Sequence, residues 1–341
     1  MNGDADRSEP KNEKNYGLAF CFVALAATVG FAAISAAASL YFTLAVSAAF
    51  GAYLAFGSER PIFAACAVVL SFGVIYIISK DVLTAAKLTG AIILAGASLG
   101  VCKKFKLNFF KSSFAVGAVS AAVMASLLAV ALYSEYGSVA EGVTKYGEEF
   151  RSALTLYLRT SLTDSSGVQL ISDNLIEELV SLAIAMIPGI AAAIFEALGA
   201  ASYMLFKLIC RFFKITVRAA NEYKIPRTSV VFFAVSAVLA GIFSIFNATA
   251  VAELAALNIC FALSLPTLFD GIARLVDRFK NPPVVNLPDG KQIRRSPVLP
   301  VVLIAGSAII SPIFPIILTL VYSVWGTIKE IIVNSKKGNE R

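Results

Sequence analysis

Residues 16–58 read YGLAFCFVALAATVGFAAISAAASLYFTLAVSAAFGAYLAFGS and contain no acidic or basic side chain. A helix needs about 20 residues to cross a bilayer, so this run is long enough for two crossings. Only α-helices and closed β-barrels satisfy their own backbone polar groups in lipid. The run is far too long for barrel strands of roughly 10 alternating residues. The sequence therefore predicts an all-α membrane protein.

The composition of the whole chain supports this class. Of the 341 residues 58% are hydrophobic and 15% are charged, whereas a soluble domain carries about a quarter charged residues. The chain has no histidine, which removes His–metal ligation and Ser-His-Asp chemistry. Its five cysteines stand singly in or beside apolar runs: Cys21, Cys66, Cys102, Cys210 and Cys260. We expect no enzyme activity, metal, cofactor or nucleic-acid partner.

Apolar segments recur along the chain at a length suited to membrane helices. They lie at about 17–35, 40–57, 62–79, 82–101, 113–133, 179–206, 228–247, 250–268 and 298–328. The last contains Pro312 and Pro315, and proline interrupts helix hydrogen bonding. It is therefore either one kinked span or a hairpin of two short arms. We predict a polytopic transmembrane helical bundle of about nine to ten membrane segments.

Basic residues are distributed unevenly between alternate loops. With a cytoplasmic N-terminus, the segments 207–227 and 270–296 and the C-terminal tail would all face the cytoplasm, and they are rich in Lys and Arg. We expect a multi-pass protein of the bacterial plasma membrane with its N-terminus inside. The expected division is a disordered cytoplasmic tail (1–15), a first membrane half (16–133), an outer loop (134–178), a second membrane half (179–328) and a basic tail (329–341).

The outer loop carries an amphipathic pattern. Apolar side chains recur there at helical spacing: Val139, Val143, Tyr146, Phe150, Leu154 and Tyr157. Such a helix lies on the outer membrane surface or over the mouth of the bundle. Two interpretations stay open: the helix is a lid over a solute site, or it has no role beyond the packing of its apolar stripe.

Glu196 is the outstanding ionisable residue at membrane depth, where a charge is costly and often functional. A kink is expected before it, at Met186–Gly189. Gly189, Gly199 and Tyr203 share its helix face by spacing. These four residues are a candidate substrate-binding site for a solute or a cation. The alternative is a carboxyl that is neutral or bonded to hydroxyls and only locks helix packing.

Lys87 and Glu253 lie at similar expected depths, just inside the outer ends of their spans. Opposite charges at equal depth predict an intramembrane ion pair. The alternative is that Lys87 extends alone to the membrane interface.

Three stretches carry a family resemblance: Tyr53–Pro61 with Gly96-x-x-x-Gly100-x-x-Lys103-Lys104, then Ile187-Pro188-Gly189 through Tyr203 to Lys224-Ile225-Pro226-Arg227, and finally Val321–Lys329. They resemble the YybS-like family of predicted bacterial multi-pass membrane proteins of unknown function. Thr327 departs from the acidic residue usual there. The first spans are also similar to substrate-binding subunits of energy-coupling-factor transporters, which implies solute binding by analogy.

These features favour a transporter-like membrane subunit that binds a small solute. The chain has no G-x-x-x-x-G-K-[ST] motif, so it would lack its own ATPase. Its partners would be the lipid bilayer, an energising ATPase or another membrane protein, and further copies of itself. The alternative is a non-transporting scaffold, for envelope or signalling assembly, that recruits cytoplasmic partners through the basic segments 207–227 and 270–296.

Overall fold

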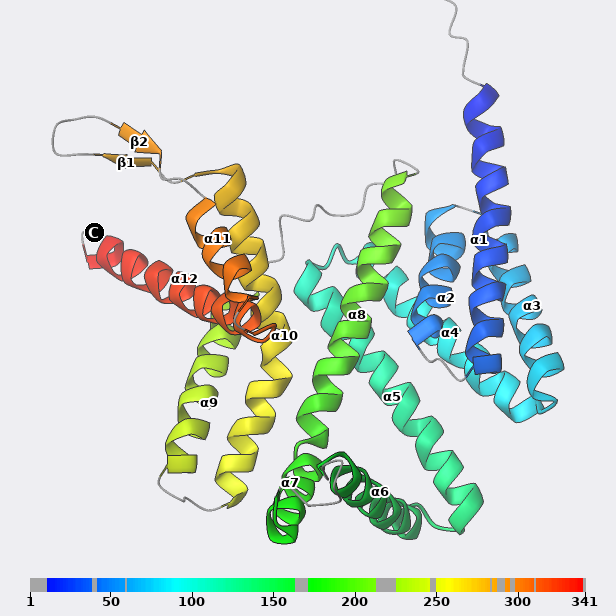
Figure 1. Ribbon diagram of the computed structural model, residues 1–341. Helices are drawn as coiled ribbons and strands as arrows, with labels where there is room; N and C mark the ends of the chain where they lie inside the picture. Colours follow the sequence, from blue (N-terminus) through cyan, green and yellow to red (C-terminus); the bar gives the residue numbers. More distant parts are fainter. Residues whose placement is uncertain are drawn as a thin grey trace, which may run out of the picture. The chain divides into compact units, whose positions relative to one another are not determined.

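The computed structural model describes residues 11–38, 42–58, 60–162, 171–212, 225–245, 250–282, 284–286, 292–294, 298–309 and 311–339. Within these residues the chain forms twelve α-helices, one π-helical turn and one pair of short strands (Figure 1). Eight of the described helices are long and apolar enough to cross a membrane, and Thr43–Gly57 is a shorter apolar helix. The predicted class, a polytopic helical membrane protein, is confirmed.

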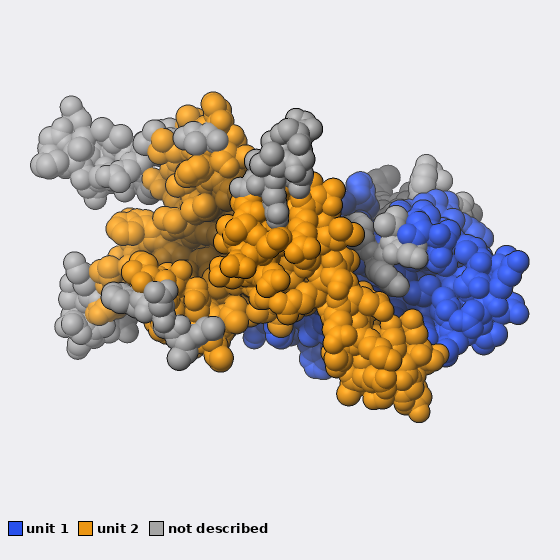
Figure 2. All heavy atoms as spheres, turned by 60° about the horizontal axis from the view of Figure 1, so that its bottom comes forward, with its two compact units in different colours: residues 1–127, 195–220 blue, residues 128–194, 221–341 orange. Residues whose placement is uncertain are grey.

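The chain divides into two compact units, coloured separately in Figure 2. Unit 1 comprises residues 1–127 and 195–220, and unit 2 comprises residues 128–194 and 221–341. Two long helices, α5 (Phe109–Tyr136) and α8 (Ile187–Phe212), contribute residues to both units.

Unit 1 is built on four packed helices. They are α1 (Lys11–Ala38), α2 (Phe42–Ala52) continued by the π-helical turn η1 (Tyr53–Gly57), α3 (Pro61–Ser79) and α4 (Val82–Lys104). Helix α1 packs on α2 and α3, and α4 packs on the same two helices. Small residues line these contacts: a Cβ on Gly96 would lie 3.4 Å from the carbonyl oxygen of Ala48. Lipid gives no hydrophobic drive between helices, so close backbone packing of this kind holds them together.

Unit 2 contains α6 (Val139–Ser161), α7 (Asp173–Ala185), α9 (Arg227–Ile245), α10 (Ala250–Lys280), α11 (Val298–Ser307) and α12 (Phe314–Asn339). Helices α9 and α10 form an antiparallel pair, and α12 packs across both (Figure 1). Between α10 and α11, β1 (Val284–Asn286) pairs antiparallel with β2 (Gln292–Arg294).

The segment 298–328 forms two helices rather than one kinked span. Helix α11 ends at Ser307 and α12 begins at Phe314, and the two pack against each other. Pro312 lies in the turn between them, and Pro315 lies in the first turn of α12, where its missing N–H costs nothing. The two arms differ in length: α11 has 10 residues, about 15 Å, which is half of a crossing, whereas α12 has 26 residues.

The expected kink before Glu196 is a complete break between α7 and α8 at Met186. Asn258 of α10 fills it. Its side-chain amide donates to the carbonyl oxygens of Ala185 and Leu254, both at 2.9 Å, and its carbonyl oxygen accepts from the amide of Gly189 at 2.7 Å. A Cβ on Gly189 would lie 2.8 Å from this side chain, so only glycine fits. One asparagine therefore satisfies backbone groups that the broken helix leaves open.

We expect Asn258→Ala to lower the free energy of unfolding by about 2 kcal/mol, because it leaves the partly buried Gly189 amide and Ala185 carbonyl without their partner. Chemical unfolding in detergent measures the change. Asn281→Ala is the control, since that asparagine is exposed and its side-chain amide donates to the nearby Asp277 carboxylate. Equal stability of the two variants would contradict this role.

The predicted amphipathic helix is present as α6. Five of its six predicted apolar residues are exposed: Val139, Val143, Tyr146, Phe150 and Tyr157 are each 40–66% accessible, and Leu154 is half-buried. On its polar face, Arg159 forms a salt bridge of 3.0 Å with Asp173 of α7. An apolar stripe that no described residue covers suits a helix lying at a membrane interface.

Helix α4 begins with an N-cap aspartate. The Asp81 carboxylate accepts from the Thr84 hydroxyl at 2.6 Å and from the amides of Thr84 and Leu83 at 2.8 and 3.1 Å. The hydroxyl of Thr84, followed by these amides, lowers the pKa of Asp81. The pKa of Asp81 is therefore lower in the folded state than in the unfolded state, where it is about 3.9. The cap stabilises the folded protein above that unfolded-state pKa, and this stabilisation is lost as the pH falls through the lower folded-state pKa.

We therefore expect the stability difference between the wild type and Asp81→Asn to depend on pH only in the acid range. Asparagine also caps helices but does not titrate. Thermal midpoints of both proteins, measured in detergent from about pH 3 to pH 7, should diverge only below about pH 4, where the wild type loses stability. Curves that stay parallel throughout would contradict the assignment.

Candidate functional site

Glu196 lies where α8 crosses α5 within unit 1. Two glycines meet at this crossing. A Cβ on Gly199 would collide with the carbonyl oxygen of Ser113 and lie 2.6 Å from the amide of Gly117, and a Cβ on Gly117 would lie 2.7 Å from the carbonyl oxygen of Phe195. The crossing is thus a contact of backbone on backbone.

The candidate side chains on this face of α8 are buried in the same contact. Glu196 is 9% exposed and Tyr203 is 2% exposed. The Tyr203 ring packs on Phe109 of α5, with ring centroids 5.9 Å apart. Among the described residues Glu196 has neither an ion pair nor a side-chain hydrogen bond. Gly189, in contrast, serves the junction with Asn258. The structure thus gathers Glu196, Gly199 and Tyr203 against α5, and their role in solute binding remains a hypothesis.

The two residues of the predicted ion pair belong to different units. Lys87 lies on α4 in unit 1, and Glu253 lies in the first turn of α10 in unit 2. Both are half-buried. The ion pair stays a prediction.

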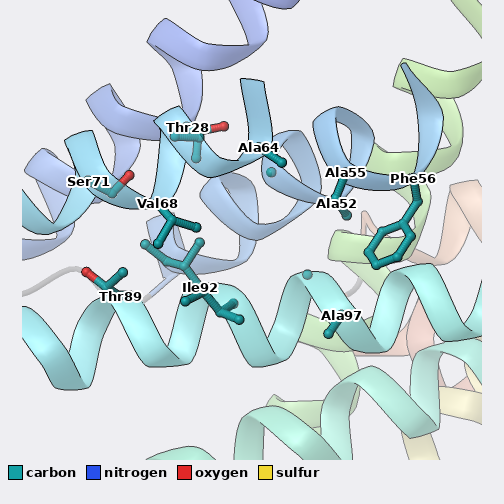
Figure 3. Close-up of a pocket in the computed structure, with 14 residues that line it drawn as sticks. Thr28, Ala52, Ala55, Phe56, Ala64, Val68, Ser71, Thr89, Ile92 and Ala97 are labelled. Carbon is teal, nitrogen blue, oxygen red and sulfur yellow. The ribbon is translucent and has the colours of Figure 1, made fainter. Parts of the chain in front are cut away.

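A cavity of about 150 Å³ lies among α1, α2, η1, α3 and α4 (Figure 3). Its wall is made mainly of small and apolar side chains, including Ala52, Ala67, Ile92 and Gly96. None of the described side chains that line it is ionisable. The turn η1 contributes Ala55 and Phe56, and π-helical turns are frequent at functional sites.

Two hydroxyl groups in this wall are buried without a partner. Ser71 on α3 is 1% exposed and Thr89 on α4 is 5% exposed. Neither Ser71 Oγ nor Thr89 Oγ1 has a hydrogen-bond partner within the described part of the chain. The nearby Thr28 behaves differently, because its hydroxyl donates to the carbonyl of Ala24 at 2.8 Å. Both residues line the cavity, and an unsatisfied buried hydroxyl costs about 1–3 kcal/mol, so a hydrogen-bonding partner that reached either one would be stabilising.

The cavity reaches the protein surface on an apolar side. Phe56, Val68 and Ile93 line it and are also 44%, 36% and 44% exposed. An occupant would therefore enter past hydrocarbon-like side chains.

A buried ionic cluster joins α10 to α12 in unit 2. Asp270 is fully buried and accepts from Arg274 Nε at 2.5 Å and from Ser323 Oγ at 2.7 Å. Arg274 also donates to Glu330 at 2.6 Å and to Thr327 Oγ1 at 3.0 Å. All three side-chain nitrogens of Arg274 are therefore committed. The cluster links α10 to α12. Gly326 has no side chain and so leaves room for the Arg274 guanidinium.

The sequence pattern does not predict this cluster, because Arg274 follows the apolar run 250–268 and is expected in an inner loop. A signal was present: Asp270 and Arg274 stand four residues apart directly after an apolar run, the spacing at which opposite charges pair on a helix. Ser71 and Thr89 were also missed. No spacing distinguishes them from the many hydroxyls in this chain that bond their own helix.

The described part of the chain has eight candidate spans, helix crossings mediated by glycine, and charges that are paired or buried at helix contacts. These features define a polytopic helical membrane protein. Residues 59–288 match the family described as predicted membrane protein (DUF2232), and the chain belongs to this family. No curated protein and no solved structure matches it. No cluster of metal-ligating side chains occurs among the described residues.

Proposed function

We propose that this protein is a membrane subunit that binds a small uncharged solute in the cavity among α1–α4. The observation that carries the proposal is the pair of buried, unpartnered hydroxyls of Ser71 and Thr89 in a wall that is otherwise apolar. A pocket of apolar side chains with a few polar groups is the usual form of a small-molecule site.

The cavity restricts the size and charge of the solute. Its volume is about 150 Å³, and an apolar cavity of about that size holds benzene. A solute with one small ring, and with one or two hydrogen-bonding groups for the hydroxyls, fits these dimensions. A charged solute does not suit the wall, because no described lining side chain could neutralise it.

Transport of the solute would require a partner. The sequence holds no nucleotide-binding P-loop, so accumulation against a gradient would depend on an energising ATPase or on a coupled ion. Glu196 lies outside the lining of this cavity. We therefore assign solute binding to the α1–α4 cavity and keep Glu196 as a separate hypothesis for a coupled proton or cation, testable with Glu196→Gln.

A thermal-shift screen of the purified protein in detergent tests the proposal. The probes are uracil, pyrimidine, nicotinamide and benzyl alcohol, with benzoate and nicotinate as charged counterparts. A solute that binds only the folded state raises the melting temperature by mass action. We expect at least one uncharged ring to stabilise the protein and its charged counterpart to have no effect.

Three variants connect a stabilising probe to the cavity. Ser71→Ala and Thr89→Val each remove one hydroxyl, and each should weaken binding by about 2- to 10-fold. Thr28→Val is the matched control, since its hydroxyl is already bonded to Ala24. If no uncharged ring stabilises the protein, or if all three variants bind alike, the two hydroxyls hold only water or remain unbonded and the proposal fails.

A further inference from the structure

A second hollow lies in unit 2, between the C-terminal part of α10 and the middle of α12, and has a volume of about 490 Å³. One face of each helix lines it. Arg274, Arg278 and Asn281 follow one another at helical spacing on α10, and Tyr322, Trp325 and Lys329 do so on α12. Cationic side chains of both helices thus line one space next to the buried ionic cluster.

The donors that face this hollow are not equally available. Arg274 is fully committed to Asp270, Glu330 and Thr327. Arg278 donates from Nη1 to the Tyr322 hydroxyl at 3.1 Å. Its Nε is buried and has no partner among the described residues. Arg278 lines the hollow, and a buried guanidinium N–H without an acceptor costs free energy.

The carboxylates of the hollow are already bonded within the protein. Glu330 pairs with Arg274 at 2.6 Å and with Arg227 at 3.3 Å. Asp277 accepts from the Asn281 amide at 3.0 Å. Lys329 makes no ion pair or side-chain hydrogen bond within the described residues. Arg278 and Lys329 therefore provide positive charge and donors that the protein itself does not use.

Trp325 lies beside these cationic side chains in the wall of the hollow. It is the single tryptophan of the chain and is 66% exposed. Basic pockets between membrane helices are suited to anionic headgroups.

We propose that this hollow binds a phosphate group, with Arg278 and Lys329 as its donors. The planar guanidinium of arginine matches phosphate oxygens, and charge-assisted hydrogen bonds are about twice as strong as neutral ones. The volume accommodates the group that bears the phosphate as well. That group is either the glycerol of an anionic phospholipid or a soluble phosphate monoester.

Binding to the delipidated full-length protein in detergent tests the site and separates the two sources. Native mass spectrometry measures retention of phosphatidylglycerol against phosphatidylcholine. Isothermal titration measures glycerol 3-phosphate against glycerol. A preference for phosphatidylglycerol alone identifies a lipid site, and binding of glycerol 3-phosphate identifies a site for soluble phosphate esters.

The double variant Arg278→Gln/Lys329→Gln should bind the phosphate-bearing probe with at least tenfold lower affinity than the wild type. Lys280→Gln is the matched control, because Lys280 is exposed at the end of α10 outside the lining and should change affinity less than twofold. If the double variant fails to fold, Lys329→Gln alone replaces it, because Lys329 is exposed. This single variant should also bind the probe more weakly than the wild type. Absence of binding by both phosphate probes, or equal loss in Lys280→Gln, overturns the proposal.

Discussion

Gly199→Leu is expected to disrupt the packing of α8 on α5 and to lower the free energy of unfolding by about 3 kcal/mol or more. The added side chain would collide with the carbonyl oxygen of Ser113 and with the backbone of Gly117. Backbone atoms in a helix cannot move aside as a flexible side chain can, so the helices themselves must separate. Unfolding by SDS titration in micelles measures the loss.

Glycines elsewhere in the membrane helices provide the control. A Cβ on Gly90 of α4 or on Gly241 of α9 would meet no atom of the described chain within 4 Å. Alanine at either position should be neutral or should stabilise the helix by roughly 0.5–1 kcal/mol, because glycine is a poor helix former. A Gly199→Leu protein as stable as these controls would show that α5 and α8 do not cross at these glycines.

Arg274→Ala is expected to cost about 3–5 kcal/mol, because it leaves the fully buried Asp270 without its cation. The larger part of this loss should come from the unpaired charge rather than from the lost contact. Asp270→Asn/Arg274→Met, which removes both charges and keeps the volume, should therefore recover most of the stability. The same SDS titration measures all three proteins.

The exposed end of the same cluster supplies a comparison. Arg227 pairs with Glu330 at 3.3 Å, and their side chains are 49% and 33% exposed. Arg227→Gln should cost less than about 1 kcal/mol. If Arg274→Ala costs no more than Arg227→Gln, the Asp270–Arg274 pair does not hold α10 to α12.

Much of the fold is predictable from the sequence, because lipid leaves few alternatives. The uncharged run at 16–58 requires helices, the spacing of Val139, Val143 and Tyr146 requires an amphipathic one, and Pro188 with Gly189 indicates an interruption. The structure confirms each of these elements. Asn258, which completes the interruption, lies 69 residues from Gly189 and could not be assigned from local pattern.

The functional sites are less predictable, because they depend on which polar atoms remain unbonded after packing. Ser71 and Thr28 are both hydroxyl residues in apolar helices, yet only Thr28 bonds its own backbone. Asp270 and Arg274 follow the apolar run of 250–268 as loop charges would, but α10 continues to Lys280 and buries them against α12. The hydrogen bonding of Ser71 and the burial of Asp270 thus depend on helix length and on which helices pack together. The sequence did indicate Glu196 as a buried carboxylate, and the structure places it at a helix crossing.

The most direct test of solute binding is a titration of the strongest ring compound from the screen into the wild type and into Ala67→Phe. Ala67 is 2% exposed and lines the α1–α4 cavity, so a phenyl group there occupies the space of the solute. Ala65→Phe, on the exposed face of the same helix, is the matched control. We predict saturable binding by the wild type and by Ala65→Phe, and none by folded Ala67→Phe. Equal affinity of all three proteins would contradict the account.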